Sequence, residues 1–314
     1  MRNVGVPCRP LRIGPLVGRA GRAAPAPSPS VASGDGTSVE SRPFASFGGA
    51  PQAASAAVPH PRLRVASARS PVYALRTVAE QRNPIIAALD VPTAEQALKL
   101  AELIAPAVGA FKIGGELFTA AGPDIVRRVR ATGAAVFLDL KFHDIPNTVA
   151  KSVASAIRLD VQMLTIHTSG GAEMMRAAEK SAVDTAKQLG LALPLVLGVT
   201  VLTSSDAGTL TEIGCEPNPE HQVARLAWLA VTAGLRGLVC SPLELVALRQ
   251  ILPAHIQLVT PGIRTGAEKA DDQKRTLTPR EAMAAGASWL VIGRPIYGAE
   301  NPRAAAEKIL ESLS

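Results

Sequence analysis

Three charged residues follow one another closely after an apolar stretch. Residues 134–138 are AAVFL, and Asp139, Lys141 and Asp144 come soon after them. Alternate side chains of a β-strand point to the same face, so a strand here would place Asp139 beside Lys141. Charges on an inward face cost free energy unless they are paired. The spacing therefore predicts a paired cluster with a chemical role or, as the simpler alternative, a solvated ion pair at the end of a surface strand.

Polar residues also end several other apolar runs. Asp90 follows residues 85–89, and Lys112 lies within residues 108–113. The corresponding positions later in the chain are His167, Thr203, Gly262 to Arg264, and Gly293 with Arg294. The last pair suits phosphate, because glycine lets a backbone N–H approach an anion and arginine can bind two oxygens at once. A glycine turn with a surface arginine is the alternative, and we interpret His167 as a structural or rim histidine.

The elements that must position these residues alternate regularly along the chain. Apolar runs typical of buried strands cover residues 85–90, 108–113, 134–138, 161–167, 194–201, 237–240, 256–260 and 288–292. Helices are predicted at 93–105, 123–130, 148–159, from 171, 220–233, 243–251, from 278, and 302–313. Eight strand–helix units predict an α/β fold, the (βα)8 TIM barrel. A doubly wound sheet is the rival, but residues 90–92 lack the glycine-rich turn that often follows its first strand.

Helix-start residues support two of these boundaries. Thr278, Pro279 and Glu281 have the types expected at the N-cap, the first helical position and the third. Asn147 or Thr148 is expected to cap the helix that follows Pro146 in the charged stretch.

The ends of the strands are where a barrel of this kind carries its active site. The predicted strand ends therefore place the charged residues of the first three strands at one end of the barrel. A polar stretch at 264–276, which contains Arg264 and Gln273, follows the seventh strand, where a lid would lie.

The N-terminal quarter differs in composition from the rest. Residues 1–80 contain ten arginines, no lysine and three acidic residues, which accounts for the whole formal charge of +7. They show no sustained helical or strand period, so we predict a disordered tail before a barrel domain at 81–314. The arginine-rich, acid-poor composition also suits an organelle transit peptide, and a start codon assigned too far upstream would explain it as well. The high isoelectric point belongs to this tail and is no argument for a nucleic-acid-binding fold.

The cysteines and the apolar runs argue against a disulfide-stabilised, cysteine-metal or membrane-spanning protein. Cys8, Cys215 and Cys240 have no metal-binding or disulfide spacing, which fits a reducing compartment. There is no run of about 18 apolar residues, so no transmembrane helix is expected. We expect a cytoplasmic protein with neither a nucleic-acid nor a membrane partner, unless the tail directs it to an organelle.

The stretch DLKFHDIPNT, residues 139–148, closely resembles the signature of the orotidine 5'-phosphate decarboxylase family. Further motifs recur in the family's order: ALD at 88–90, FKIG at 111–114, VTVLTS at 199–204, VTPGIR at 259–264, DQ at 272–273 and IGRPI at 292–296. The resemblance covers roughly residues 84–312 and leaves the tail outside. It implies a cofactor-free and metal-free decarboxylation of orotidine 5'-phosphate to UMP and CO2.

The resemblance also implies roles for individual residues. Lys141 would protonate C6 of the pyrimidine, Asp139 would lie beside the substrate carboxylate, and Lys112 with Asp144 would complete an alternating charge network. The implied substrate contacts are Asp90 and Lys112 at the ribose, Thr203 at the base, and Gln273 and Arg294 at the phosphate. Further implied substrate-binding residues, without a particular part of the substrate assigned to them, are Asp139, Asp144, Ile145, Thr148, Arg264 and Gly293. A homodimer with shared active sites is implied, in which Asp144 works in the neighbouring subunit's site.

The physical chemistry agrees with these implied roles. Loss of CO2 leaves negative charge on C6, and a fixed ammonium aimed at that carbon stabilises the charge where it develops. The carboxylate of Asp139 would repel the substrate carboxylate by about 4 kcal/mol at 4 Å and an effective dielectric of about 20. That is roughly three decades of rate at most, so Lys141 and remote phosphate binding must supply more.

The sequence is also compatible with two alternatives to this family. Sugar-phosphate decarboxylases and aldolases of the same barrel suprafamily share the DxKxxD spacing but use Mg²⁺, and an acidic metal ligand stands in them where this chain has Lys112. A cation at that position opposes metal binding. The other alternative is a non-catalytic barrel whose basic tail binds RNA or anionic lipid. Such binding would weaken as the salt concentration rises.

Overall fold

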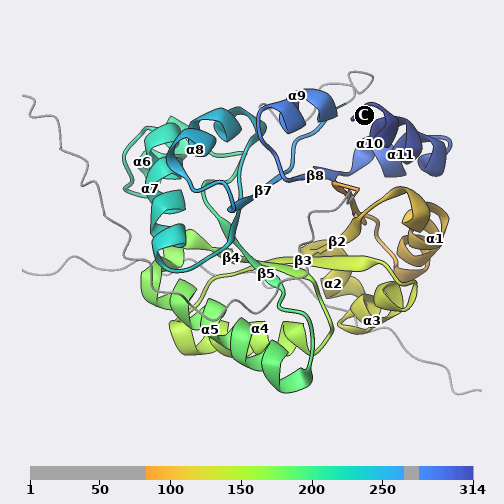
Figure 1. Cartoon of the computed structure of the whole chain (residues 1–314), viewed down its shortest axis with the longest axis horizontal. Coiled ribbons are helices and arrows are strands. Elements are labelled where there is room, and N and C mark those ends of the chain that lie inside the picture. The colour runs from red at the N-terminus through yellow and green to blue at the C-terminus, as the bar shows by residue number, and fades with distance from the viewer. Residues whose placement is uncertain (1–82, 265–275, 314) are drawn as a thin grey trace, which may run out of the picture. The chain divides into compact units, whose positions relative to one another are not determined.

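The computed structural model describes residues 83–264 and 276–313, and they form a closed barrel of eight parallel strands (Figure 1). The strands are β1 (Ile85–Ala88), β2 (Ala110–Gly114), β3 (Ala135–Phe142), β4 (Met163–His167), β5 (Leu195–Val199), β6 (Gly237–Val239), β7 (Gln257–Thr260) and β8 (Trp289–Ile292). They pair in sequence order, and β8 closes onto β1. The predicted (βα)8 barrel is confirmed, and the doubly wound sheet is excluded.

Helices connect and cover the strands. They are α1 (Ala94–Ile104), α2 (Gly115–Ala121), α3 (Asp124–Ala131), α4 (Pro146–Ile157), α5 (Gly171–Leu189), α6 (Ala207–Glu212), α7 (Pro219–Thr232), α8 (Leu245–Ile251), α9 (Pro279–Ala284), α10 (Arg294–Tyr297) and α11 (Pro302–Glu311). Short 3-10 turns lie at η1 (Ala105–Ala107), η2 (Thr168–Gly170) and η3 (Pro242–Glu244). The sequence prediction missed α2, α6 and α10, because helices of four to seven residues are too short to show a clear helical period.

One predicted helix cap is confirmed and one is wrong. At α9 the Thr278 hydroxyl accepts a hydrogen bond from the Glu281 backbone N–H, and the Glu281 carboxylate accepts one from the Thr278 N–H. At α4 the N-cap position is Ile145, not Asn147 or Thr148. The helix begins earlier than predicted because Pro146 occupies its first position, where proline's fixed φ suits a helix and its missing N–H costs nothing.

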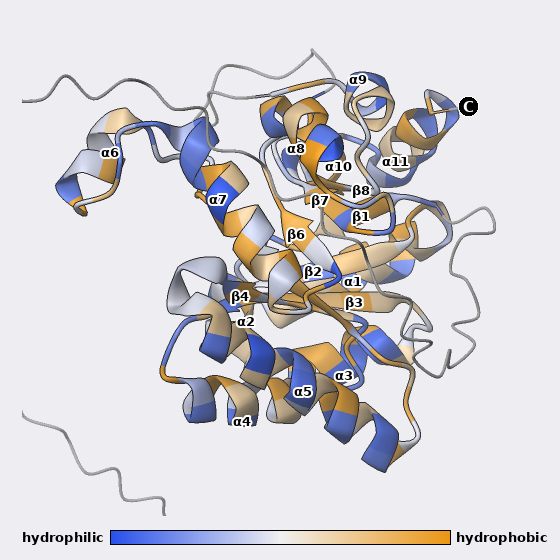
Figure 2. Cartoon of the chain, turned by 60° about the vertical axis from the view of Figure 1, so that its left-hand side comes forward, coloured by the Kyte–Doolittle hydropathy of each residue, from blue (hydrophilic) through white to orange (hydrophobic). Residues whose placement is uncertain are grey.

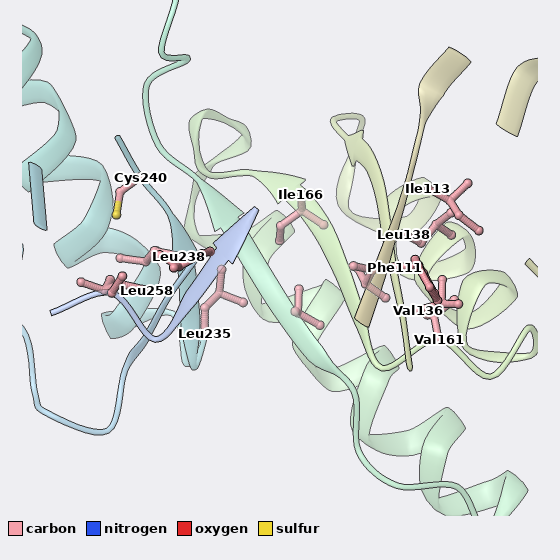
Figure 3. Packing of buried hydrophobic residues seen from close by; sticks show 14 of the residues in the cluster. Phe111, Ile113, Val136, Leu138, Val161, Ile166, Leu235, Leu238, Cys240 and Leu258 are labelled. Atoms are coloured by element: carbon pink, nitrogen blue, oxygen red, sulfur yellow. The ribbon is translucent and has the colours of Figure 1, made fainter. Parts of the chain in front are cut away.

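Strand side chains alternate between two apolar layers. The inner layer fills the barrel with Ile86, Ala88, Ala110, Phe137, Met163, Leu197, Val259, Trp289 and Val291. The outer layer packs strands against helices, and Figure 3 shows Phe111 and Ile113 of β2 beside Val136 and Leu138 of β3. The helices carry both hydrophilic and hydrophobic residues around their axes, while the strands are mostly hydrophobic (Figure 2). This alternation fixes which residues at the strand ends point inward.

The opposite, N-terminal end of the barrel is held by arginines. Arg249 of α8 donates hydrogen bonds to the Gly286 and Ile256 carbonyls and to the Ser288 hydroxyl. Arg236 pairs with Glu179 of α5 at 2.9 Å. These arginines pair with groups at the N-terminal end, whereas the polar groups of the C-terminal end face a cavity.

Within the described residues, no helix has the length and hydropathy needed to cross a membrane.

Candidate active site

A cavity of about 430 Å³ lies at the C-terminal ends of the strands. Its walls are formed by Ala88, Asp90, Lys112, Phe137, Asp139, Lys141, Val199, Val201, Leu202, Thr203, Val239, Cys240, Pro261, Gly262, Arg264, Val291, Gly293, Arg294 and Tyr297. Its floor is the inner layer of the barrel, since Ala88, Phe137 and Val291 belong to both. The cavity is therefore apolar below and charged at one side, which suits a small polar ligand.

The charged side is a row of alternating cations and anions. Lys112 Nζ lies 2.8 Å from Asp90 Oδ1 and 4.0 Å from Asp139 Oδ2. Lys141 Nζ lies 2.8 Å and 2.9 Å from the two carboxylate oxygens of Asp139. The side chains of Lys112 and Asp139 are only 12% and 14% exposed. Each of these partly buried charges thus has an opposite charge beside it, as the sequence predicted for a paired cluster.

The strand that carries this row is not regular. Leu138 pairs with Leu164 and Phe142 with Ile166, so β3 advances by four residues over a stretch in which β4 advances by two. This register shift is a bulge in β3. Lys141 has a φ of 49°, in the left-handed region that non-glycine residues seldom adopt. Asp139 and Lys141 do meet, as predicted, but a bulge and a left-handed residue bring them together in addition to strand alternation.

A buried hydroxyl from the next strand holds the bulge. Thr165 of β4 is 0% exposed. Its Oγ1 accepts a hydrogen bond from the Lys141 backbone N–H at 2.9 Å and lies 3.0 Å from Asp139 Oδ1. The sequence prediction did not include Thr165, although it continues the inward-facing positions of β4 after Met163.

The other side of the cavity is lined by Gly293 and two arginines. A Cβ added at Gly293 would come within 3.3 Å of the Tyr297 ring and 3.8 Å of Asp90 Oδ2, so glycine keeps this part open. Arg294 starts α10 immediately after it, and Arg264 also lines the cavity. Gly293 and Arg294 thus both line the cavity, while the phosphate binding expected of them stays a prediction.

Comparison with known proteins decides between the possible barrel families. Residues 83–309 match the orotidine 5'-phosphate decarboxylase / HUMPS family. A protein of Opitutus terrae named orotidine 5'-phosphate decarboxylase is 54% identical over 229 residues, which cover 73% of this chain and 97% of the relative. The chain belongs to the orotidine 5'-phosphate decarboxylase family.

Other relatives agree with this membership. The protein of that name from Nitrosococcus oceani is 48% identical over 74% of this chain and 99% of its own length. The crystal structure of orotidine 5'-phosphate decarboxylase from Lactobacillus acidophilus superposes with a TM-score of 0.66 at 36% identity, covering 74% of this chain and 99% of that one.

Residues 1–80, the predicted tail, lie outside the described residues, so their predicted disorder stays a prediction.

Not all site residues predicted from the family signature line the cavity. Asp144 is exposed, and its Oδ1 accepts a hydrogen bond from the Ile145 N–H at 2.6 Å. Ile145 is 66% exposed, and Thr148 lies in the first turn of α4. Gln273 lies outside the described residues. Asp144, Ile145 and Thr148 therefore do not line the cavity of their own chain.

Three other side chains near the cavity were not predicted as ligands. Burial and the nearby Asp90 carboxylate raise the pKa of Tyr297 above its ordinary value, so the phenol stays a hydrogen-bond donor. Burial raises the pKa of the Cys240 thiol to about 12. His167 lies with its ring centroid 5.4 Å from that of His143. Burial, with smaller effects from His143 and Lys141, lowers the pKa of His167, which keeps it neutral and agrees with a structural role.

Proposed function

We propose that the barrel decarboxylates orotidine 5'-phosphate to UMP and CO2, the last step of UMP synthesis, directly and without a cofactor. The observation that carries the proposal is the Lys141 ammonium held 2.8 Å from Asp139 at the wall of the cavity. This chain covers nearly the full length of relatives named for that activity, which supports the same substrate.

The proposed step needs only the side chains of the charged row. The C6–carboxylate bond breaks, CO2 leaves, and its bonding electron pair remains on C6. Lys141 stabilises that charge and then gives a proton to C6, which leaves the lysine neutral until solvent reprotonates it. Asp139, beside the substrate carboxylate, repels the bound substrate more than the transition state, where that charge is leaving.

The remaining residues of the cavity would hold the nucleotide. We assign Asp90 and Lys112 to the ribose hydroxyls, because their 2.8 Å pair offers a donor and an acceptor side by side. Thr203 is assigned to the base, and Gly293, Arg294 and Arg264, with Gln273, to the phosphate. Phosphate binding far from C6 then contributes free energy to the chemical step.

The activity is tested with the purified full chain and orotidine 5'-phosphate in EDTA, following the loss of pyrimidine absorbance. We expect turnover that exhaustive chelation does not reduce. If chelation abolished turnover and Mg²⁺ restored it, the reaction would be that of the metal-dependent members of the suprafamily. Lys112 argues against that outcome, because its ammonium stands between the Asp90 and Asp139 carboxylates that a divalent cation would need.

A homodimer with shared active sites is the second part of the proposal. Asp144 and Ile145 are exposed on the turn after β3, and Asp144 does not line the cavity of its own chain. A second copy that covered this turn would bury the side chain of Ile145, which is 66% exposed. Asp144 would then complete the charge row in the neighbouring cavity, with Ile145 and Thr148 beside it.

Mixed dimers of Asp139→Ala and Asp144→Ala chains test the sharing. If Asp144 serves the neighbouring cavity, one site of each mixed dimer carries both defects and the other is intact. Two inactive variants would then regain about a quarter of wild-type turnover on equal mixing. No recovery, with subunit exchange shown by mass, would exclude a shared site.

We also propose a cytoplasmic location. The described cysteines, Cys215 and Cys240, are free thiols, which is typical of a reducing compartment. A fluorescent protein fused behind residues 1–80 tests the alternative, since accumulation in an organelle would identify those residues as a targeting segment.

A further inference from the structure

Thr165 connects the backbone of one catalytic residue to the side chain of another. Its hydroxyl lies 2.9 Å from the Lys141 backbone nitrogen and 3.0 Å from Asp139 Oδ1. It is not among the residues that line the cavity, and its hydroxyl is placed to act through the two residues that it contacts. We therefore expect any effect of Thr165 on the reaction to pass through Asp139 and Lys141.

The direction of both hydrogen bonds follows from the groups involved. The Lys141 N–H can only donate, so the Thr165 oxygen accepts from it. An ionised Asp139 carboxylate can only accept, so the Thr165 hydroxyl proton points at Oδ1. Because Thr165 is 0% exposed, no water is placed to replace either bond. The single hydroxyl is thus used fully, once as acceptor and once as donor.

The hydrogen bond to the backbone occurs where the chain is strained. Lys141 has a φ of 49°, and such a conformation persists in a non-glycine residue only when its surroundings enforce it. At this point β3 has left its register with β4, so the regular ladder does not hold the Lys141 N–H. The Thr165 side chain takes the place of the missing ladder bond.

The second hydrogen bond fixes the carboxylate that pairs with the ammonium. Asp139 Oδ1 accepts from Thr165 and also lies 2.8 Å from Lys141 Nζ. With Oδ1 held from β4, the carboxylate can rotate little about its terminal bond. The Lys141 side chain is then restrained at both ends, at its backbone by Thr165 and at its ammonium by Asp139.

We propose that Thr165 is a positioning residue that sets the geometry of the Asp139–Lys141 pair for decarboxylation. The inference rests on the proposed function, because it assigns Thr165 to the step that Lys141 performs. It predicts that losing the hydroxyl harms the chemical step while leaving nucleotide binding largely intact.

The test compares three variants of the full chain. Thr165→Val removes the hydroxyl and keeps the shape, and Thr165→Ser keeps the hydroxyl. Thr168→Val is the matched control, because Thr168 is equally buried and its hydroxyl also donates to a neighbouring strand, to the Val199 carbonyl of β5 at 2.8 Å. For each variant we would measure kcat for orotidine 5'-phosphate, the Kd of UMP and the Tm.

We expect kcat of Thr165→Val to fall on the order of 100-fold, as small misplacements of reacting groups do. The Kd of UMP should change less than about threefold, because product binding rests on the phosphate and ribose contacts. Thr165→Ser should recover most of kcat, and Thr168→Val should keep it despite a comparable loss of Tm.

Three outcomes would overturn the proposal. They are an unchanged kcat in Thr165→Val, an equal fall of kcat in Thr165→Val and Thr168→Val, and a fall in Thr165→Ser as large as in the valine variant. If Thr165→Val does not fold, Thr165→Ala is judged by the same criteria. Wild-type protein without decarboxylase activity would instead refute the proposed function, so the two failures are distinguishable.

Discussion

Replacing Lys141 by alanine tests the centre of the proposed mechanism. The ammonium is held 2.8 Å and 2.9 Å from the two oxygens of Asp139, and its side chain is 37% exposed. It can therefore reach a substrate in the cavity while remaining fixed by a largely covered carboxylate, which is 14% exposed. The substitution removes the only proton donor that we assign to C6.

The size of the effect follows from two contributions. A unit positive charge about 4 Å from the developing carbanion stabilises it by about 4 kcal/mol at an effective dielectric of about 20. That corresponds to about three decades of rate. Positioned proton donation contributes another two to four decades or so. We therefore expect kcat of Lys141→Ala to fall by about five to seven decades.

Binding of the product should respond much less. UMP has no C6 carboxylate, so the Asp139 charge left behind in Lys141→Ala meets no anion at that position. The phosphate contacts proposed at Gly293 and Arg294 are unchanged. Calorimetric titration should give a Kd of UMP within about tenfold of wild type.

The assay needs a lysine control of the same kind. Lys180→Ala removes a lysine that pairs with Asp184 on the exposed face of α5, and kcat should stay at the wild-type value. The reasoning about Lys141 is refuted if Lys141→Ala loses less than about two decades of kcat. It is also refuted if kcat and UMP affinity fall in parallel, since the lysine would then serve binding rather than the transition state.

Three further predictions concern the rest of the site. Arg294→Ala should lower kcat/KM for orotidine 5'-phosphate by two decades or more, as a lost charge-assisted phosphate contact does, and an unchanged value would place the phosphate elsewhere. Iodoacetamide at about pH 8 should label Cys215 in the native chain but not Cys240, because the Cys240 pKa of about 12 leaves almost no thiolate. Labelling of Cys240, detected by peptide mapping, would contradict its burial. The lowered pKa of His167 means that the unfolded chain binds more protons than the folded chain below about pH 6.5, the ordinary value. The contribution of His167 to stability is therefore complete above that pH and is lost as the pH falls, so His167→Gln should flatten the decline of Tm between about pH 6.5 and 5.

Much of the fold could be predicted from local patterns. Apolar runs located all eight strands, because a strand buried on both faces needs an almost continuous apolar sequence. The inward positions also follow from alternation: Ala88 leads to Asp90, Ala110 to Lys112, and Phe137 to Asp139. The residues of the charged row could therefore be named from the sequence, together with Gly293 and Arg294.

The geometry of the site was decided by the tertiary structure. The 4.0 Å approach of Lys112 to Asp139 depends on the register between β2 and β3, which no local pattern specifies. The left-handed Lys141 donates its N–H to a hydroxyl that lies 24 residues further along the chain. Thr165 is an ordinary strand residue by its type, and only the pairing of β4 with β3 brings it against the bulge of β3. Side-chain alternation is a property of one strand, whereas bulges, registers and buried polar contacts are properties of neighbouring strands.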